Sequence, residues 1–140
     1  GNPFFDSVES VLAHILFSVP AIKGLEFGSG FGIAEMLGSE ANDSYYYDGD
    51  QIKTRTNHNG GILGGITDGM PIIYKVAIKP PASITKVQQT INIEDKTAAE
   101  LSVEGRHDPI IVPRAIPVLE AVTAIAILDL LLDSKFYKYD

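Results

Sequence analysis

The sequence contains no cysteine, so disulfide bonds and thiolate chemistry are excluded, while a cytoplasmic setting is permitted. It has three histidines, His14, His58 and His107, and their spacing does not match that of metal ligands, so we expect no built-in metal site. Basic residues are a minority, because 11 Lys and Arg face 18 Asp and Glu, for a net charge of -7. Since binding to a phosphate backbone needs clustered Lys and Arg, nucleic acid is not an expected partner.

A long apolar run without charges is also missing. The most apolar stretch, 116–132, is shorter than the roughly 20 residues that cross a bilayer, and it contains Glu120 and Asp129. We therefore expect a helix buried in protein and no membrane association. The chain begins with Gly1 rather than Met and without the basic and apolar segments of a signal peptide, so we expect its start to be internal to a longer protein or cut from one. We also expect a cytoplasmic protein.

The residues that are present suit one globular domain: 45% of the 140 residues are hydrophobic and 21% are charged. Apolar spacing predicts a helix over 6–18 and a strand over 21–27. A short helix over 33–37 and a polar surface loop over 39–51 should follow. The three tyrosines in this loop are expected to be packing residues.

Four further strands are expected, over 61–66, 71–78, 88–93 and 98–103, with a turn at 67–69. Pro113 or Pro117 should open the last helix. Because that helix is apolar nearly all round, it must be covered by a sheet and by other parts of the full protein or another subunit. Consecutive strands with short turns predict an α+β fold, in which an antiparallel sheet packs against helices.

Paired glycines characterise the first polar segment, 56–66, which reads TNHNGGILGGI. Glycine pairs let a backbone approach a flat or anionic ligand closely. Taken alone, the segment is better interpreted as glycines in a bulged or twisted strand. The role of His58, beside the glycines, is ambiguous.

Two prolines make the second segment rigid. Lys79 and Ser83 flank Pro80, Pro81 and Ala82 directly after a predicted strand. The prolines favour an extended backbone, and a cation and a hydroxyl at its ends would suit a phosphate. The plainer alternative is a rigid loop with a solvated lysine.

The third segment, 105–109, is the most site-like part of the chain. Arg106 can clamp a carboxylate or phosphate, and His107 and Asp108 can move protons when their pKa values are tuned. Alternatively, Asp108 caps the turn and Arg106 pairs with an acidic neighbour. Residue chemistry alone leaves these two interpretations even.

Together the segments resemble the C-terminal portion of the chorismate synthase family over essentially the whole chain. Ordered stretches with matching intervals are more specific than any one motif. They lie at 5–10, 19–28, 38–40, 56–66, 79–84, 105–109, 113–118 and 120–121. The resemblance implies that residues 1–140 are one compact C-terminal unit. It also implies that the N-terminal portion, with two catalytic histidines and most substrate-binding arginines, is absent.

The resemblance implies an anti-1,4-elimination of phosphate from 5-enolpyruvylshikimate 3-phosphate to give chorismate, in the shikimate pathway of aromatic amino acid biosynthesis. Reduced FMN is required without net redox change, since the flavin is thought to donate an electron transiently and recover it. Family members usually form tetramers, and their fold is a β-α-β sandwich with a helical layer between antiparallel sheets. The fragment alone is expected to be inactive.

The resemblance also assigns roles to particular residues. Asp108 matches an aspartate implicated in proton handling near the flavin, Arg106 would contact both flavin and substrate, and His107 lies near the substrate. Where the family commonly has Thr and Ser, this chain has Pro81 and Ala82, so Ser83 and the backbone would carry those contacts. The implied flavin-binding residues are Pro20, Ala21, Gly64, Lys79, Pro80, Pro81, Ala82, Ser83 and Arg106.

Two other functions compete with a flavin-dependent lyase. The chain could be a non-catalytic oligomerisation domain in which the glycine and proline loops are only turns. A stand-alone module that binds FMN or a nucleotide is the weaker alternative.

Overall fold

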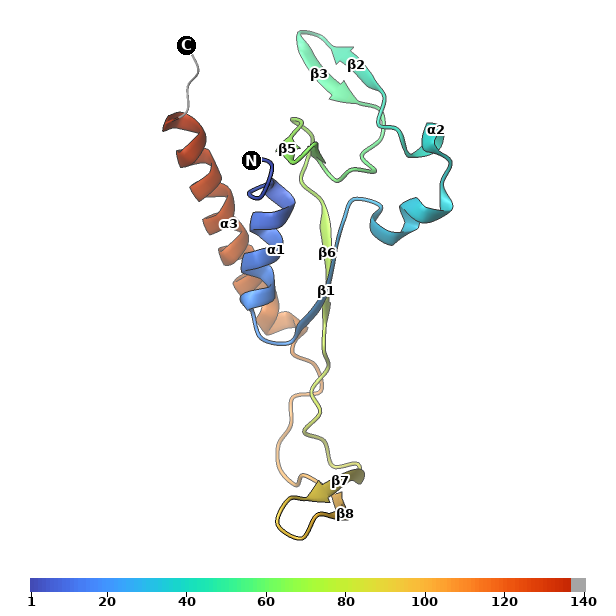
Figure 1. Cartoon of the computed structure of the whole chain (residues 1–140), viewed down its shortest axis with the longest axis vertical. Helices are drawn as coiled ribbons and strands as arrows, with labels where there is room; N and C mark the ends of the chain where they lie inside the picture. The colour runs from blue at the N-terminus through green and yellow to red at the C-terminus, as the bar shows by residue number, and fades with distance from the viewer. Residues whose placement is uncertain (137–140) are drawn as a thin grey trace.

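The computed structural model describes residues 1–136 of the chain. Its elongated body is built around a helix pair and a long two-stranded ribbon (Figure 1). The elements follow in the order α1 (Val8–Ser18), β1 (Ile22–Phe27), the 3₁₀ helix η1 (Gly30–Glu35), α2 (Gly38–Ala41), β2 (Tyr45–Asp48), β3 (Gln51–Thr54), β4 (Ile62–Leu63), β5 (Ile66–Thr67), β6 (Tyr74–Ile78), β7 (Gln88–Asn92), β8 (Thr97–Leu101) and α3 (Val112–Phe136). Mixed helices and antiparallel strands confirm the predicted α+β class.

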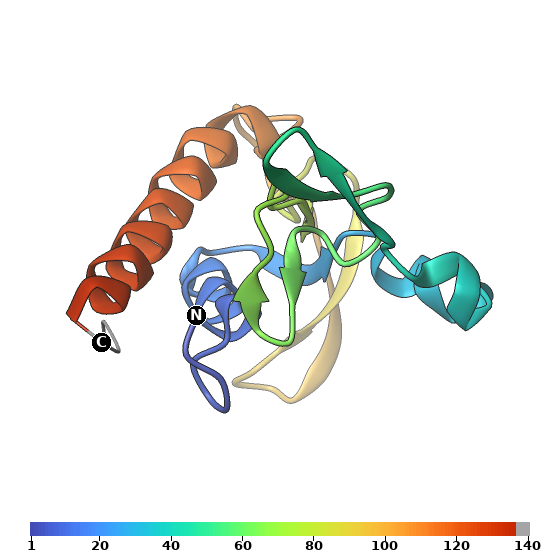
Figure 2. The same ribbon diagram turned by 90° about the horizontal axis from the view of Figure 1, so that it is seen from above.

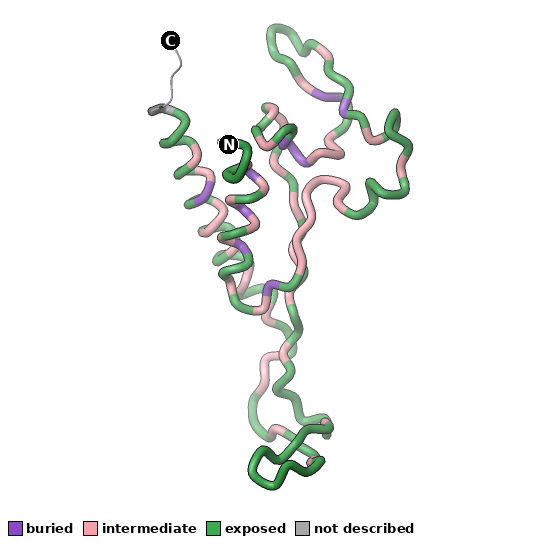
Figure 3. The backbone as a smooth tube through the Cα atoms, in the orientation of Figure 1, coloured by how far each residue is buried: buried purple, intermediate pink, exposed green. Residues whose placement is uncertain are grey.

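Helix α1 supplies the centre of the core. Ser7 caps it by accepting a 3.1 Å hydrogen bond from the backbone amide of Ser10. Val8, Leu12 and Leu16 recur at four-residue intervals, so they share one face of the helix, and all three are fully buried. They form the core with Ile62 and Ala126. Figure 3 shows how few buried positions lie elsewhere.

Helix α3 runs antiparallel to α1 and packs along it (Figures 1 and 2). Pro113 lies in its first turn as predicted, and Pro117 is tolerated inside it. The Thr123 hydroxyl donates to the carbonyl of Leu119 at 2.6 Å, so the hydroxyl of Tyr74 must donate the 2.6 Å bond that joins β6 to Thr123.

Among the described residues this last helix is covered on one side, mainly by α1 rather than by the predicted sheet. Its predicted cover by other parts of the full protein or another subunit stays a prediction. Ala126 is buried, whereas Ile125 is 59% and Leu128 is 57% exposed. By length and composition alone, 112–134 could also cross a membrane. Core helices of soluble proteins meet the same criteria, so this is weak evidence for a membrane span.

The strands pair in four separate antiparallel two-stranded ribbons, so one continuous sheet does not form among the described residues. The predicted strand over 61–66 is wrong, because Gly64 and Gly65 have φ values of 61° and 84° and turn the chain back between β4 and β5. Strand β6 then pairs with β1, far away in sequence. The predicted strands at 88–93 and 98–103 are confirmed as β7 and β8, which pair with each other.

The predicted surface loop over 39–51 is also wrong, since it contains α2 and most of the β2–β3 hairpin. The hairpin turns at Gly49, whose φ is 62°. Sequence signals for it existed, because three consecutive tyrosines favour a strand and the Asp-Gly pair favours a tight turn. The tyrosines are not packing residues here: Tyr45 and Tyr47 are more than half exposed, and Tyr46 lies under the guanidinium of Arg55. The short helix predicted over 33–37 is instead η1, which ends at Glu35.

Candidate functional site

The Lys79 segment begins where β6 ends. The backbone amide of Lys79 donates a 2.7 Å hydrogen bond to the carbonyl of Ala21, just before β1. This bond extends the β1–β6 ribbon and brings Pro20 and Ala21 beside Lys79. Ala21 has a φ of 71°, a left-handed conformation that non-glycine residues rarely adopt.

The 105–109 segment returns to the same place from β8. The amide of Val103 donates to the carbonyl of Ile84 at 3.3 Å, and the Ser102 hydroxyl donates to the carbonyl of Thr85 at 2.7 Å. These bonds hold the two loops side by side around a cavity of about 320 Å³. Its lining residues come from both segments: Pro80, Pro81, Ile84, Thr85, Gly105, His107, Asp108 and Pro109.

Polar side chains in this cavity are held by specific partners. His107 is half-buried, and its Nε2 lies 2.9 Å from the carbonyl oxygen of Val103. Asp108 is also half-buried and forms an ion pair with Arg114, in the first turn of α3, at 2.7 Å. Lys79, Ser83 and Arg106 are exposed next to the cavity in sequence, so their polar groups are accessible from solvent.

Gly64 lies apart from this cluster. It occupies the turn between β4 and β5, at the opposite end of β6 from Lys79 (Figure 1). This turn contacts the start of α1, because the amide of Val8 donates to the carbonyl of Gly65 at 3.0 Å. The structure therefore places Pro80, Pro81, His107 and Asp108 on one cavity, with Lys79 bonded to Ala21 at the end of β6, whereas Gly64 lies elsewhere.

A second polar centre surrounds Asp43, a residue of the predicted surface loop over 39–51 for which no site was predicted. The buried carboxylate accepts hydrogen bonds from the backbone amides of His58 and Asn59, both at 2.8 Å, and from the Thr56 hydroxyl at 2.7 Å. Burial acts to raise the pKa of Asp43, but these hydrogen bonds outweigh it and hold the pKa below its usual value. The carboxylate thus fixes the loop that precedes the glycine pairs.

In the glycine-rich segment, the backbone around His58 and Gly60 passes close to the backbone at Gly28. A Cβ on Gly28 would lie 2.0 Å from the carbonyl oxygen of His58, and one on Gly60 would lie 2.5 Å from the amide nitrogen of Gly28. The Ser29 hydroxyl is 2.7 Å from Nδ1 of His58, which ties the two segments together. Gly60 therefore has a packing role, and His58 is part of the same junction.

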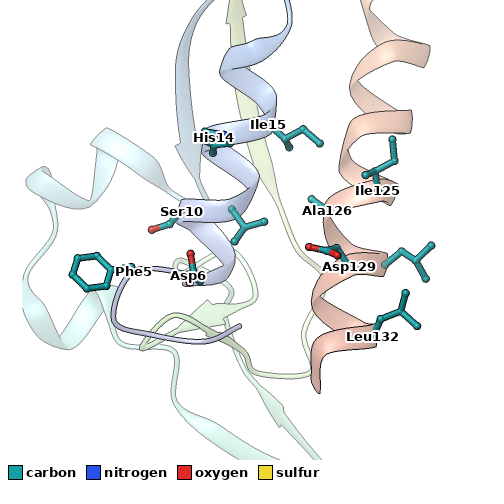
Figure 4. A pocket seen from close by; sticks show the side chains of 11 residues that line it. Phe5, Asp6, Ser10, His14, Ile15, Ile125, Ala126, Asp129 and Leu132 are labelled. Carbon is teal, nitrogen blue, oxygen red and sulfur yellow. The ribbon is translucent and has the colours of Figure 1, made fainter. Parts of the chain in front are cut away.

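A groove of about 700 Å³ lies between α1 and α3 (Figure 4). Ile15, Ile125 and Leu132 line it with apolar surface, while His14 and Asp129 add polar groups from the two helices. His14 is exposed on α1, so it is not a core residue among the described part of the chain. The described residues also hold no cluster of His, Asp and Glu suited to a metal ion.

Comparison with known proteins identifies relatives of this arrangement. The profile of the family described as chorismate synthase matches residues 1–132. A chorismate synthase from Methanococcus aeolicus is 53% identical over 97% of this chain and 37% of its own length. One from Lachnoclostridium phytofermentans is 52% identical, over 100% of this chain and 38% of its own length. A solved structure titled "Crystal Structure of Chorismate Synthase" matches with a TM-score of 0.70 and 32% identity, over 91% of this chain and 31% of that one.

These matches cover only part of each relative. This chain spans a little over a third of the length of the curated relatives that it matches.

Proposed function

This chain belongs to the chorismate synthase family, and from this premise we propose that it forms the flavin-contacting C-terminal portion of a chorismate synthase. The full-length protein would convert 5-enolpyruvylshikimate 3-phosphate to chorismate by anti-1,4-elimination of phosphate. The observation that carries the proposal is the cavity between the 80–85 and 105–109 segments, which joins two motifs that are distant in sequence.

The residues around this cavity fit a flat, anionic cofactor such as reduced FMN. Pro80 and Pro81 give a rigid wall without backbone N–H groups, and Ile84 adds apolar surface. Lys79 supplies a cation and Ser83 a hydroxyl, the partners that a phosphate needs. The volume lies in the usual range for small-molecule sites, about 300–1,000 Å³.

Each residue would have a distinct task. Lys79 and Ser83 would bind the flavin phosphate, while Pro20, Ala21 and the 80–82 backbone would position the cofactor. Arg106 would bind where flavin and substrate meet, with His107 beside the substrate, and Asp108 would hold or accept a proton near the flavin ring. When bound, the reduced flavin supplies a transient electron to the elimination. Gly64 lies at the far end of β6, so to contact flavin it would need a second binding surface contributed by another part of the full-length protein or by another subunit.

The chain by itself would not complete this site. Most substrate-binding arginines and two histidines would come from an N-terminal portion, consistent with the share of its relatives that this chain spans. The exposed apolar face of α3 supports this, since solvent-exposed apolar surface of that extent marks an interface. We place the full-length protein in the cytoplasm as a homotetramer.

The test is an anaerobic assay of the full-length protein with reduced FMN and the substrate, which follows chorismate by absorbance. The wild type should turn over, whereas the 140-residue chain alone should not. The double variant R106Q/D108N should lose nearly all activity. Normal turnover by that variant would instead favour a non-catalytic oligomerisation role, and appreciable chorismate production by the 140 residues would refute the incompleteness of the site.

A further inference from the structure

We propose that Arg114 is a positioning residue that holds the Asp108 carboxylate in its working orientation. This inference rests on the proposed function, because it concerns the same cavity. Nη1 of Arg114 lies 2.7 Å from one carboxylate oxygen of Asp108, and Nη2 donates to the other at 3.5 Å. The guanidinium therefore faces both oxygens, as a planar fork does when it clamps a carboxylate.

The hydrogen bonds that hold the Asp108 loop lie upstream of Asp108, at Ser102, Val103 and His107. The chain has no helix or strand between Leu101 and Val112. Upstream, the ring of His107 is bonded to the carbonyl of Val103. Among the described residues, Arg114 is the side chain to which the Asp108 carboxylate is bonded, so it sets the direction in which that carboxylate points.

Arg114 is itself placed by helix α3. It lies in the first turn of the 25-residue helix α3, and its amide donates to the carbonyl of Ile111 at 3.0 Å. From this position in the helix, the Arg114 side chain extends towards Asp108, four residues before the helix begins at Val112. Its side chain is 75% exposed, so replacing it should leave the fold intact.

An exposed ion pair adds little to the free energy of unfolding, so the role of this pair would be to orient the Asp108 carboxylate. In the full-length protein, R114Q should lower kcat about 100-fold, the cost expected for a displacement of about 1 Å in a reacting group. R114K keeps the charge but not the fork, so its loss should be smaller, about 10-fold. KM for the substrate and the Kd for reduced FMN should stay within about twofold, because Arg114 acts through Asp108 rather than on a ligand.

The decisive measurement is a double-variant cycle of D108N and R114Q. If Arg114 acts through Asp108, the double variant should lose no more kcat than D108N alone. R55Q removes the same charge from the β3 end, away from the cavity, and should match the wild type. A flavin-free crystal structure of R114Q should show the Asp108 carboxylate displaced, a readout independent of turnover.

The outcomes separate this inference from the proposed function. Additive losses, or a raised KM with unchanged kcat, would mean that Arg114 binds a ligand directly and would overturn the positioning role. An active wild type with a defective D108N and a normal R114Q would overturn it too, while leaving the proposed function standing. A full-length wild type without turnover would overturn the proposed function and the inference together.

Discussion

The amide of Lys79 donates its hydrogen bond to the carbonyl of Ala21, although 58 residues separate them. The bond adds one rung to the β1–β6 ribbon, and it places the two segments implied to contact flavin side by side. Ala21 meets Lys79 in a left-handed conformation, with a φ of 71°. Such strain in a non-glycine residue persists where surrounding structure holds it, often at functional sites.

Substitution of Ala21 tests whether this conformation matters. A β-branched side chain tolerates positive φ poorly, so A21V should lower the free energy of unfolding by about 1–2 kcal/mol and weaken the binding of reduced FMN. A21G should stay within about 1 kcal/mol of the wild type, since relief of strain offsets the greater freedom of the unfolded chain. Urea denaturation and flavin titration of the full-length protein measure both effects. Equal stability of A21V and the wild type would contradict the left-handed geometry.

Lys79 offers a direct test of phosphate recognition. Loss of a hydrogen bond to a charged group costs about 1.5–3 kcal/mol, so K79Q should weaken reduced FMN binding at least about 10-fold. S83A should weaken it less, because a hydroxyl is a neutral donor. K75Q is the matched control, since Lys75 is an exposed lysine on β6 that pairs with Glu26 at 2.8 Å. If K75Q and K79Q weakened flavin binding equally, the effect would come from the change in net charge, and a specific contact of Lys79 with the flavin phosphate would be contradicted.

Three glycines separate steric clash from backbone strain. G28A should destabilise the protein by about 3 kcal/mol or more, because its Cβ would meet the His58 carbonyl at 2.0 Å and its φ is 55°, so that clash and strain add. G49A has open space but a φ of 62°, so about 1–2 kcal/mol is expected. G32A has open space and no positive φ, and it should be near neutral. Thermal unfolding gives the ranking, and a mild G28A would show that the two backbones do not cross there.

Asp43 should give the stability a defined pH dependence. Its folded pKa lies below the ordinary value of 3.8, so its contribution is fully present above that pH and is lost as the pH falls through the folded pKa. D43N should lower the free energy of unfolding at pH 7 by about 1–3 kcal/mol, because an amide cannot accept all the hydrogen bonds. The gap between wild type and D43N should narrow below pH 3.8 in denaturation curves. A gap that stayed constant down to pH 2 would speak against an ionised, hydrogen-bonded Asp43.

Local patterns in the sequence were sufficient for several elements. Helix α1, strand β1 and the β7–β8 hairpin follow from spacing, caps and turn residues, because these depend on neighbours along the chain. Family membership likewise follows from ordered motifs, and the comparisons confirm it. The β4–β5 turn was missed because two adjacent glycines can serve either a bulge or a hairpin.

Long-range partners could not be predicted in the same way. The pairing of β1 with β6, the buried position of Asp43 and the clamp of Arg114 on Asp108 each join elements whose separation in sequence carries no distance information. The sequence by itself determined the family, the fold class and the residues that can carry chemistry, since these depend on residue type and order. Only the tertiary structure decided which of them meet: Lys79 is bonded to Ala21 at one end of β6, Asp108 shares a cavity with Pro80 and Pro81, and Gly64 lies at the other end of β6. Strand pairing, rather than spacing along the chain, sets those distances.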